Sequence, residues 1–164
     1  MVPKQIMRTV YFALYQSNFQ YGLLVWGGIR DNILNALMVN QNNIIRICLN
    51  KFTKQGSTNA NYKEFGVLPI RFLYKKIAIM YLVKNFNMDK DHKDLSRIRE
   101  YRKYDLTVKY AYKSFGQCFV DYLGPTFFNS MPVEFKKKIL GGKITNIKSL
   151  VYKYLFLELN NELW

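Results

Sequence analysis

Four stretches of the chain place apolar residues three and four positions apart, and this spacing constrains the fold more than any other feature. The stretches are residues 4–17, 31–50, 69–86 and 146–159. Helix caps or breakers stand at their ends: Pro3 and Asp31 precede or open the first two, and Gly141 with Gly142 precedes the last. A repeat that matches the turn of an α-helix in each long segment predicts an all-α fold.

The length and composition suit one compact unit. With 164 residues, of which 49% are apolar and 22% charged, the chain is expected to form a single irregular domain of about six helices over residues 1–164, with long surface loops. Residues 51–61 read as a loop, 62–65 as one helical turn, 124–125 as a turn and 131–138 as a further helical turn. Charged residues dominate 87–105, which predicts a mobile surface segment. Residues 108–122 fit either a helix or short strands.

Several side chains are expected at particular places in the core. Gln41 falls on the apolar stripe of residues 31–50, where an amide should be buried with its hydrogen bonds satisfied. Trp26 ends an apolar run beside two glycines and is expected to be a buried anchor between helices. Thr145 or Asn146 is expected to cap the last helix. The other residues at helical spacing are Ile6, Val10, Ala13, Leu14 and Ser17 near the start, and Ile147, Leu150, Val151, Tyr154 and Leu155 in the last stretch.

Several classes of protein are disfavoured. Cys48 and Cys118 are far apart and lack neighbouring histidines, which argues against a disulfide scaffold or zinc site and fits a reducing, intracellular compartment, nucleus or cytoplasm. The longest apolar run, residues 19–29, is too short to span a membrane. The one histidine, His92, lies among charged residues, and no paired carboxylates or phosphate-binding glycine loop occurs. We therefore expect no catalytic residues, metal ion or cofactor, and no enzyme activity of the chain on its own.

The net charge of +14 and the 25 tyrosines and phenylalanines favour a phosphate-rich partner, since basic groups and flat rings together bind nucleic acid. Codon bias in an AT-rich genome explains the same composition equally well. The candidate phosphate-binding residues form three groups along the chain. Two tyrosines, Tyr101 and Tyr104, stand beside the group at 97–103. They are Arg71, Lys75 and Lys76, then Arg97, Arg99, Arg102 and Lys103, and finally Lys136, Lys137 and Lys138.

Four short motifs occur in an order found in one known family. They are Tyr21-Gly22 with Trp26-Gly27, then Gln41 with Ile44, Ile45 and Arg46, then Phe65 to Pro69 with Tyr74, and finally Phe115-Gly116, Tyr122 to Pro125 and Asn129 to Pro132, with Phe128 and Met131 as departures. Together they resemble the thumb and post-thumb region, C-terminal to the polymerase core, of jockey-like non-LTR retrotransposon reverse transcriptases. The resemblance spans nearly the whole chain.

The resemblance implies an all-helical region that helps to hold the template and primer duplex. It implies RNA or an RNA/DNA hybrid as the partner, bound without sequence preference, and the polymerase core of a parent element as a further partner. The paired aspartates of that RNA-directed DNA polymerase are absent. We therefore expect a non-catalytic fragment or a remnant of a transposable element.

Other functions stay open beside nucleic-acid binding. The chain is alternatively a protein-interaction module, or a decayed remnant with no nucleic-acid role, and a large exposed apolar patch would favour the interaction module. A basic protein bound to a membrane surface is a further alternative, for which the helix of residues 70–86 has part of the required pattern.

Overall fold

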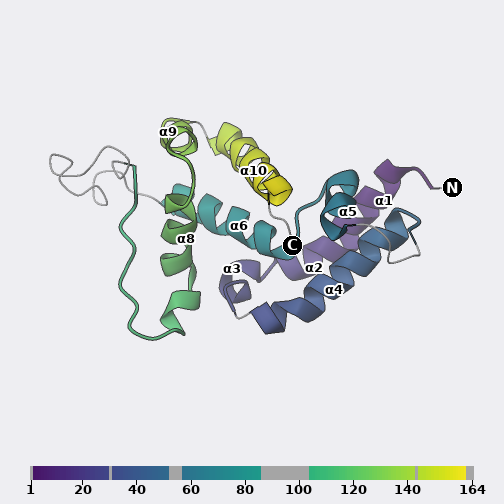
Figure 1. Ribbon diagram of the computed structural model, residues 1–164, viewed down its shortest axis with the longest axis horizontal. Coiled ribbons are helices and arrows are strands. Elements are labelled where there is room, and N and C mark those ends of the chain that lie inside the picture. The colour runs from purple at the N-terminus through teal and green to yellow at the C-terminus, as the bar shows by residue number, and fades with distance from the viewer. Residues whose placement is uncertain (1, 30, 52–56, 86–103, 143, 162–164) are drawn as a thin grey trace. The chain divides into compact units, whose positions relative to one another are not determined.

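In a computed structural model of the chain, residues 2–29, 31–51, 57–85, 104–142 and 144–161 are described, and helices dominate this part of the molecule (Figure 1). No strand occurs among these residues, so the prediction of an all-α fold is confirmed for them. Contacts divide the chain into two compact units. Unit 1 comprises residues 1–74 and 158–164, and unit 2 comprises residues 75–157. The single domain stays a prediction, and most of the segment expected to be mobile, residues 87–103, lies outside the described residues.

Unit 1 opens with one continuous helical run, although its middle is not an α-helix. The run consists of α1 (Lys4–Val10), a π-helical segment η1 (Tyr11–Gln16) and α2 (Ser17–Gln20). The Ser17 hydroxyl and the Asn18 amide donate to backbone carbonyls four residues back, at Ala13 and Leu14. Such bonds compete with the regular backbone ladder, which accounts for the wider turn.

The face of this first helix that packs inward differs from the expected stripe. Ile6, Val10 and Leu14 are exposed, whereas Tyr11 and Phe19 are buried. Tyr15 lies between these two, and its ring contacts both of theirs at centroid distances of 5.5 and 5.2 Å. Aromatic rings bury more apolar area than the aliphatic side chains do, and the Tyr11 hydroxyl has a buried partner, so the aromatic face is the one that turns inward.

The centre of unit 1 is built around Gln41 on α4 (Asp31–Cys48), which is completely buried. Its amide nitrogen donates to the Tyr11 hydroxyl at 2.8 Å and to the Leu68 carbonyl at 3.0 Å. Its amide oxygen accepts from the Tyr62 hydroxyl at 2.9 Å and from the Ile70 backbone N–H at 3.0 Å. Both donors and both acceptor positions of the amide are therefore occupied, and the prediction for Gln41 is confirmed.

Trp26, at the end of α3 (Leu23–Trp26), is not the buried anchor that we expected. It is only partly buried, and it folds back over Gly22, where an added Cβ would come within 2.6 Å of its indole nitrogen. Leu23 is the fully buried residue of this helix. The adjacent Gly27 lies so close to Tyr74 that an added Cβ would come within 2.4 Å of the ring. The close contact at this point of the core is therefore made by Gly27 and not by Trp26.

The helix α5 (Thr58–Phe65) begins earlier than the single turn expected at 62–65, so residues 58–61 are not loop. It ends at Gly66, whose φ of 75° is left-handed and suits glycine. Lys4 and Arg8 of α1 donate to the carbonyls of Glu64 and Gly66 at this end. Positive charge is favourable there, because carbonyl groups at a helix C-terminus lack intrahelical partners. Leu68 and Pro69 then lead into α6 (Ile70–Asn85), confirming the helix expected at 69–86.

Unit 2 contains most of α6, an irregular segment from residue 104, a 3-10 turn η4 (Gly116–Cys118), and α8 (Val120–Asn129). The expected turn at 124–125 is wrong, since Gly124 and Pro125 are buried inside α8. Gly124 faces α6 closely enough that a Cβ would lie 3.5 Å from Leu82. A glycine before proline also relieves the clash that disfavours helical backbone at that position.

The last two helices follow their predicted positions closely. Pro132 precedes α9 (Val133–Leu140), and the two glycines at 141–142 follow it, as expected. The final helix α10 (Ile144–Asn161) starts one or two residues before the expected cap, so neither Thr145 nor Asn146 precedes it. Its buried positions are Ile147, Val151, Leu155 and Leu159.

Candidate nucleic-acid interface

The structure places the predicted basic residues in different environments. Arg97, Arg99, Arg102 and Lys103 lie outside the described residues, so their role stays a prediction. Arg71 belongs to unit 1, where its guanidinium donates to the Asn35 side chain at 3.3 Å. Lys75 and Lys76 belong to unit 2. The ammonium of Lys75 lies 5.9 Å from the centre of the Phe127 ring, and the ammonium of Lys76 lies 4.9 Å from the centre of the Tyr152 ring.

Lys76 is the most perturbed of these lysines. Burial lowers its pKa, and the positive charge of Lys148 lowers the pKa further. The Tyr152 face stabilises the ammonium only in part, since such contacts contribute about 0.5–2 kcal/mol. The ammonium of Lys76 thus lies against the Tyr152 ring, and its contact with phosphates stays a prediction.

Lys136 is a correction to the predicted surface cluster on α9. Only 4% of its side chain is exposed, and its ammonium lies 2.6 Å from the Asp105 carboxylate and 2.6 Å from the Asn129 carbonyl. An ammonium with two internal acceptors does not reach a phosphate at the surface. Lys136 instead fastens residue 105 to α8, next to the paired hydrogen bonds that the Asn129 amide makes with the backbone of Leu106.

The neighbours of Lys136 do face outward. Lys137 and Lys138 are both exposed, and the Lys137 ammonium lies 5.3 Å from the centre of the Tyr104 ring. Both side chains therefore lie at the surface, and their contact with phosphates stays a prediction. A charge run on a helix alternates between faces, because successive residues are turned by about 100°, and this is why one member of the run is buried while two are exposed.

Unit 2 is strongly basic in the part that the structure describes. It has ten lysines and three carboxylates there, and one of the carboxylates is taken up by Lys136. The lysines are Lys75, Lys76, Lys84, Lys109, Lys113, Lys136, Lys137, Lys138, Lys148 and Lys153, and the carboxylates are Asp105, Asp121 and Glu134. An excess of positive charge of this kind favours association with polyanions.

Sequence reasoning missed a second feature of unit 2, an exposed run of rings over residues 109–119, which we call the aromatic segment. Tyr110 is 87% exposed, Tyr112 85% and Phe115 73%, with lysines at 109 and 113 between and beside them. The sequence of this region fits a helix or short strands and does not show which of its side chains are buried. The available signal of exposure was the pair of lysines, Lys109 and Lys113, on either side of the two tyrosines.

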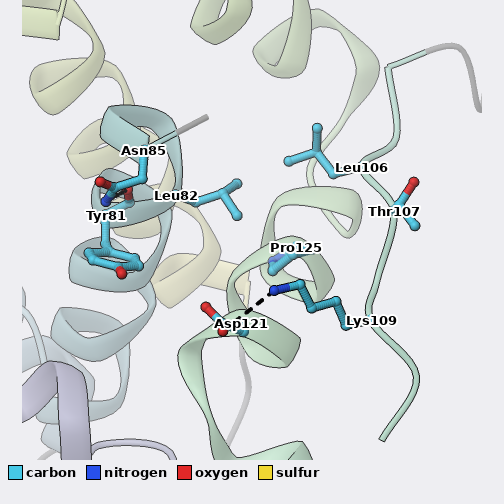
Figure 2. Close-up of a pocket in the computed structure, with 8 residues that line it drawn as sticks. All are labelled: Tyr81, Leu82, Asn85, Leu106, Thr107, Lys109, Asp121 and Pro125. Carbon is cyan, nitrogen blue, oxygen red and sulfur yellow. Dashed lines mark hydrogen bonds and ion pairs between the residues drawn. The ribbon is translucent and has the colours of Figure 1, made fainter. Parts of the chain in front are cut away.

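A small pocket of about 220 Å³ lies beside this segment, between α6, α8 and residues 106–109 (Figure 2). Leu82, Leu106 and Pro125 give it apolar walls, and the ammonium of Lys109 reaches towards the Asp121 carboxylate at 3.8 Å. Its volume is below the roughly 300–1,000 Å³ that is usual for small-molecule sites. The Lys109 and Asp121 side chains are both well exposed, unlike reactive groups held in an enclosed site, so we assign no chemistry to the pocket.

No group of three or more histidine, cysteine, aspartate or glutamate side chains in the described part of the chain is placed to hold a metal ion. None of the described helices is long and apolar enough to cross a membrane.

Comparison with known proteins adds no relative. No protein-family model, no curated protein and no solved structure matches the chain.

Proposed function

We propose that the protein is a non-catalytic helical module that binds RNA or an RNA/DNA hybrid without sequence preference. The observation that carries this proposal is the excess of lysine over carboxylate in unit 2, with Lys137 and Lys138 exposed on α9. Lysines bind phosphates, which all sequences share, so affinity is expected to depend on salt and hardly on base order. The resemblance to the thumb region of non-LTR reverse transcriptases supports the same partner, and the polymerase core of a parent element is proposed as a second one.

The test is binding of labelled RNA and of an RNA/DNA hybrid, followed by fluorescence anisotropy over a range of salt concentrations. A first variant replaces Arg97, Arg99, Arg102 and Lys103 by alanine, and a second replaces Lys137, Lys138, Lys148 and Lys153. Each removes four positive charges. If these residues contact phosphates, the slope of log affinity against log salt should flatten by up to about 3–4 units in the responsible variant.

The outcome separates a local site from general charge. A larger loss in one variant locates the phosphate contacts, whereas equal losses show that net charge alone drives binding. A wild-type protein that binds neither nucleic acid at low salt contradicts the proposal. Lys136 is left intact in both variants because its replacement would disturb the fold.

A protein-interaction module is the second candidate, and unit 1 supplies the observation that favours it. Leu14 is 69% exposed, Tyr21 97% and Val25 77%, all within the first 25 residues. Sedimentation velocity over a range of concentrations tests self-association through these side chains. A change in oligomeric state on replacing them by serine would support this reading.

A further inference from the structure

The aromatic segment exposes its rings to a degree that packing does not explain. Tyr110 and Tyr112 each keep more than four fifths of their surface in contact with water, and Phe115 nearly three quarters. An exposed ring forgoes about 25 cal/mol for each Å² that burial would remove from water. Three such rings within six residues are a concentration of exposed apolar surface that suits a partner.

The segment is held in place by bonds of its own before any partner arrives. The Gly116 N–H donates to the Lys113 carbonyl at 2.9 Å, and the Gln117 amide donates to the Ala111 carbonyl at 3.3 Å. The Phe115 ring also packs edge-on against Phe119, with centroids 5.1 Å apart. Less conformational freedom is lost on binding when a surface is already ordered, so affinity is gained.

The charges beside the rings identify the kind of partner. Lys109 and Lys113 flank the two tyrosines, and both are exposed. The Lys109 ammonium is 3.8 Å from Asp121, but both side chains are well exposed, and such pairs contribute little. Rings with lysines at their sides match a chain of bases joined by phosphates.

We propose that the aromatic segment stacks the bases of a single-stranded nucleic acid on Tyr110 and Tyr112, while Lys109 and Lys113 contact the phosphates on either side. A single strand is the fitting ligand because the faces of bases in a duplex are already stacked on each other. This inference rests on the proposed function and extends it from phosphate contact to base contact. Stacking is tolerant of sequence, since every base has a flat face.

The experiment compares two single strands of equal length and equal phosphate number, one of mixed-sequence RNA and one with abasic residues. Wild-type protein is expected to bind the strand that carries bases more tightly. Replacing Tyr110 and Tyr112 together by alanine should weaken binding to that strand by about tenfold or more and leave the salt slope unchanged. Replacing both by phenylalanine, which keeps the rings, should retain the affinity.

Tyr21→Ala is the matched control, because this tyrosine is 97% exposed in unit 1 and should not affect binding. Circular dichroism of the double alanine variant checks that the helices are intact. Equal affinity of wild-type protein for the two strands overturns the stacking site but leaves phosphate binding in place. Failure to bind either strand contradicts the proposed function itself. An unchanged affinity combined with loss of self-association in the alanine variant would assign the rings to a protein interface and also overturn the inference.

Discussion

Replacing Gln41 by leucine is the most direct test of how unit 1 is held together. Leucine has a similar volume, so the change removes hydrogen bonds without opening a large cavity. Four buried groups would lose their partner: two tyrosine hydroxyls, the Leu68 carbonyl and the Ile70 N–H. The Ile70 N–H lies at the start of α6, and backbone donors at a helix start have no partner within their own helix.

The magnitude follows from these four bonds. A typical hydrogen bond contributes about 0.5–1.5 kcal/mol net, and leaving a buried group unpaired costs about 1–3 kcal/mol. Allowing for hydroxyls that turn to other partners and for the apolar gain of leucine, Gln41→Leu should lower the free energy of unfolding by about 4 kcal/mol. That is a large part of the roughly 5–15 kcal/mol available to a folded protein.

Urea unfolding followed by tryptophan fluorescence measures the effect, because both tryptophans, Trp26 and Trp164, belong to unit 1. With a slope of about 2 kcal/mol per M, the midpoint should fall by about 2 M. Gln5→Leu is the control, since this glutamine is exposed on α1 and its replacement should change stability by less than about 0.5 kcal/mol. Adding Tyr62→Phe to Gln41→Leu should cost less than the sum of the single changes, because it removes one of the stranded groups. A midpoint equal to that of the wild type would refute the reasoning.

Three further predictions follow. Gly27→Ala places a methyl group against both the Leu23 carbonyl and the Tyr74 ring and should destabilise unit 1 by about 1–3 kcal/mol, which thermal unfolding can measure; an unchanged melting temperature would contradict this close approach. Lys136→Ala should cost about 1–3 kcal/mol in urea unfolding, while Lys138→Ala on the exposed face should cost almost nothing, and equal effects would contradict the buried ion pair. Burial raises the pKa of both tyrosines that bond Gln41 above the usual value. The unfolded chain releases these protons near pH 10 while the folded chain keeps them, so stability should fall above about pH 10, and replacing both by phenylalanine should reduce that fall.

The four long helical stretches were predictable because their apolar spacing is regular and because glycine or proline stands at or near the start of each. Gln41 was predictable for a related reason, as a single amide on an otherwise apolar stripe is stable only when its bonds are satisfied. The stripe predicted for the first helix was the wrong face, because aliphatic and aromatic residues both recur there at helical spacing. That choice depends on the distant partner of Tyr11, which is Gln41.

The candidate site was harder to predict than the fold. Three lysines in a row at 136–138 read alike in the sequence, and only the position of Asp105 across the fold shows that the first is buried. The aromatic segment was missed because exposure of a ring is decided by what packs on it, and two rings at alternate positions fit a buried strand face as well as an exposed one. The turn expected at Gly124 and Pro125 failed because local turn preference yields to the close approach of α8 and α6.

Unit 1 is assembled from two stretches that are far apart along the chain. Leu159 is buried there, beside Met38, Tyr62 and Phe72, although all of unit 2 is synthesised between these residues and Leu159. A ribosome adds about 5–20 residues per second, so on the order of ten seconds pass between the synthesis of residue 74 and that of Leu159. During this interval Met38, Tyr62 and Phe72 lack their neighbour Leu159, so we expect slower translation of residues 75–158 to lower the yield of folded protein.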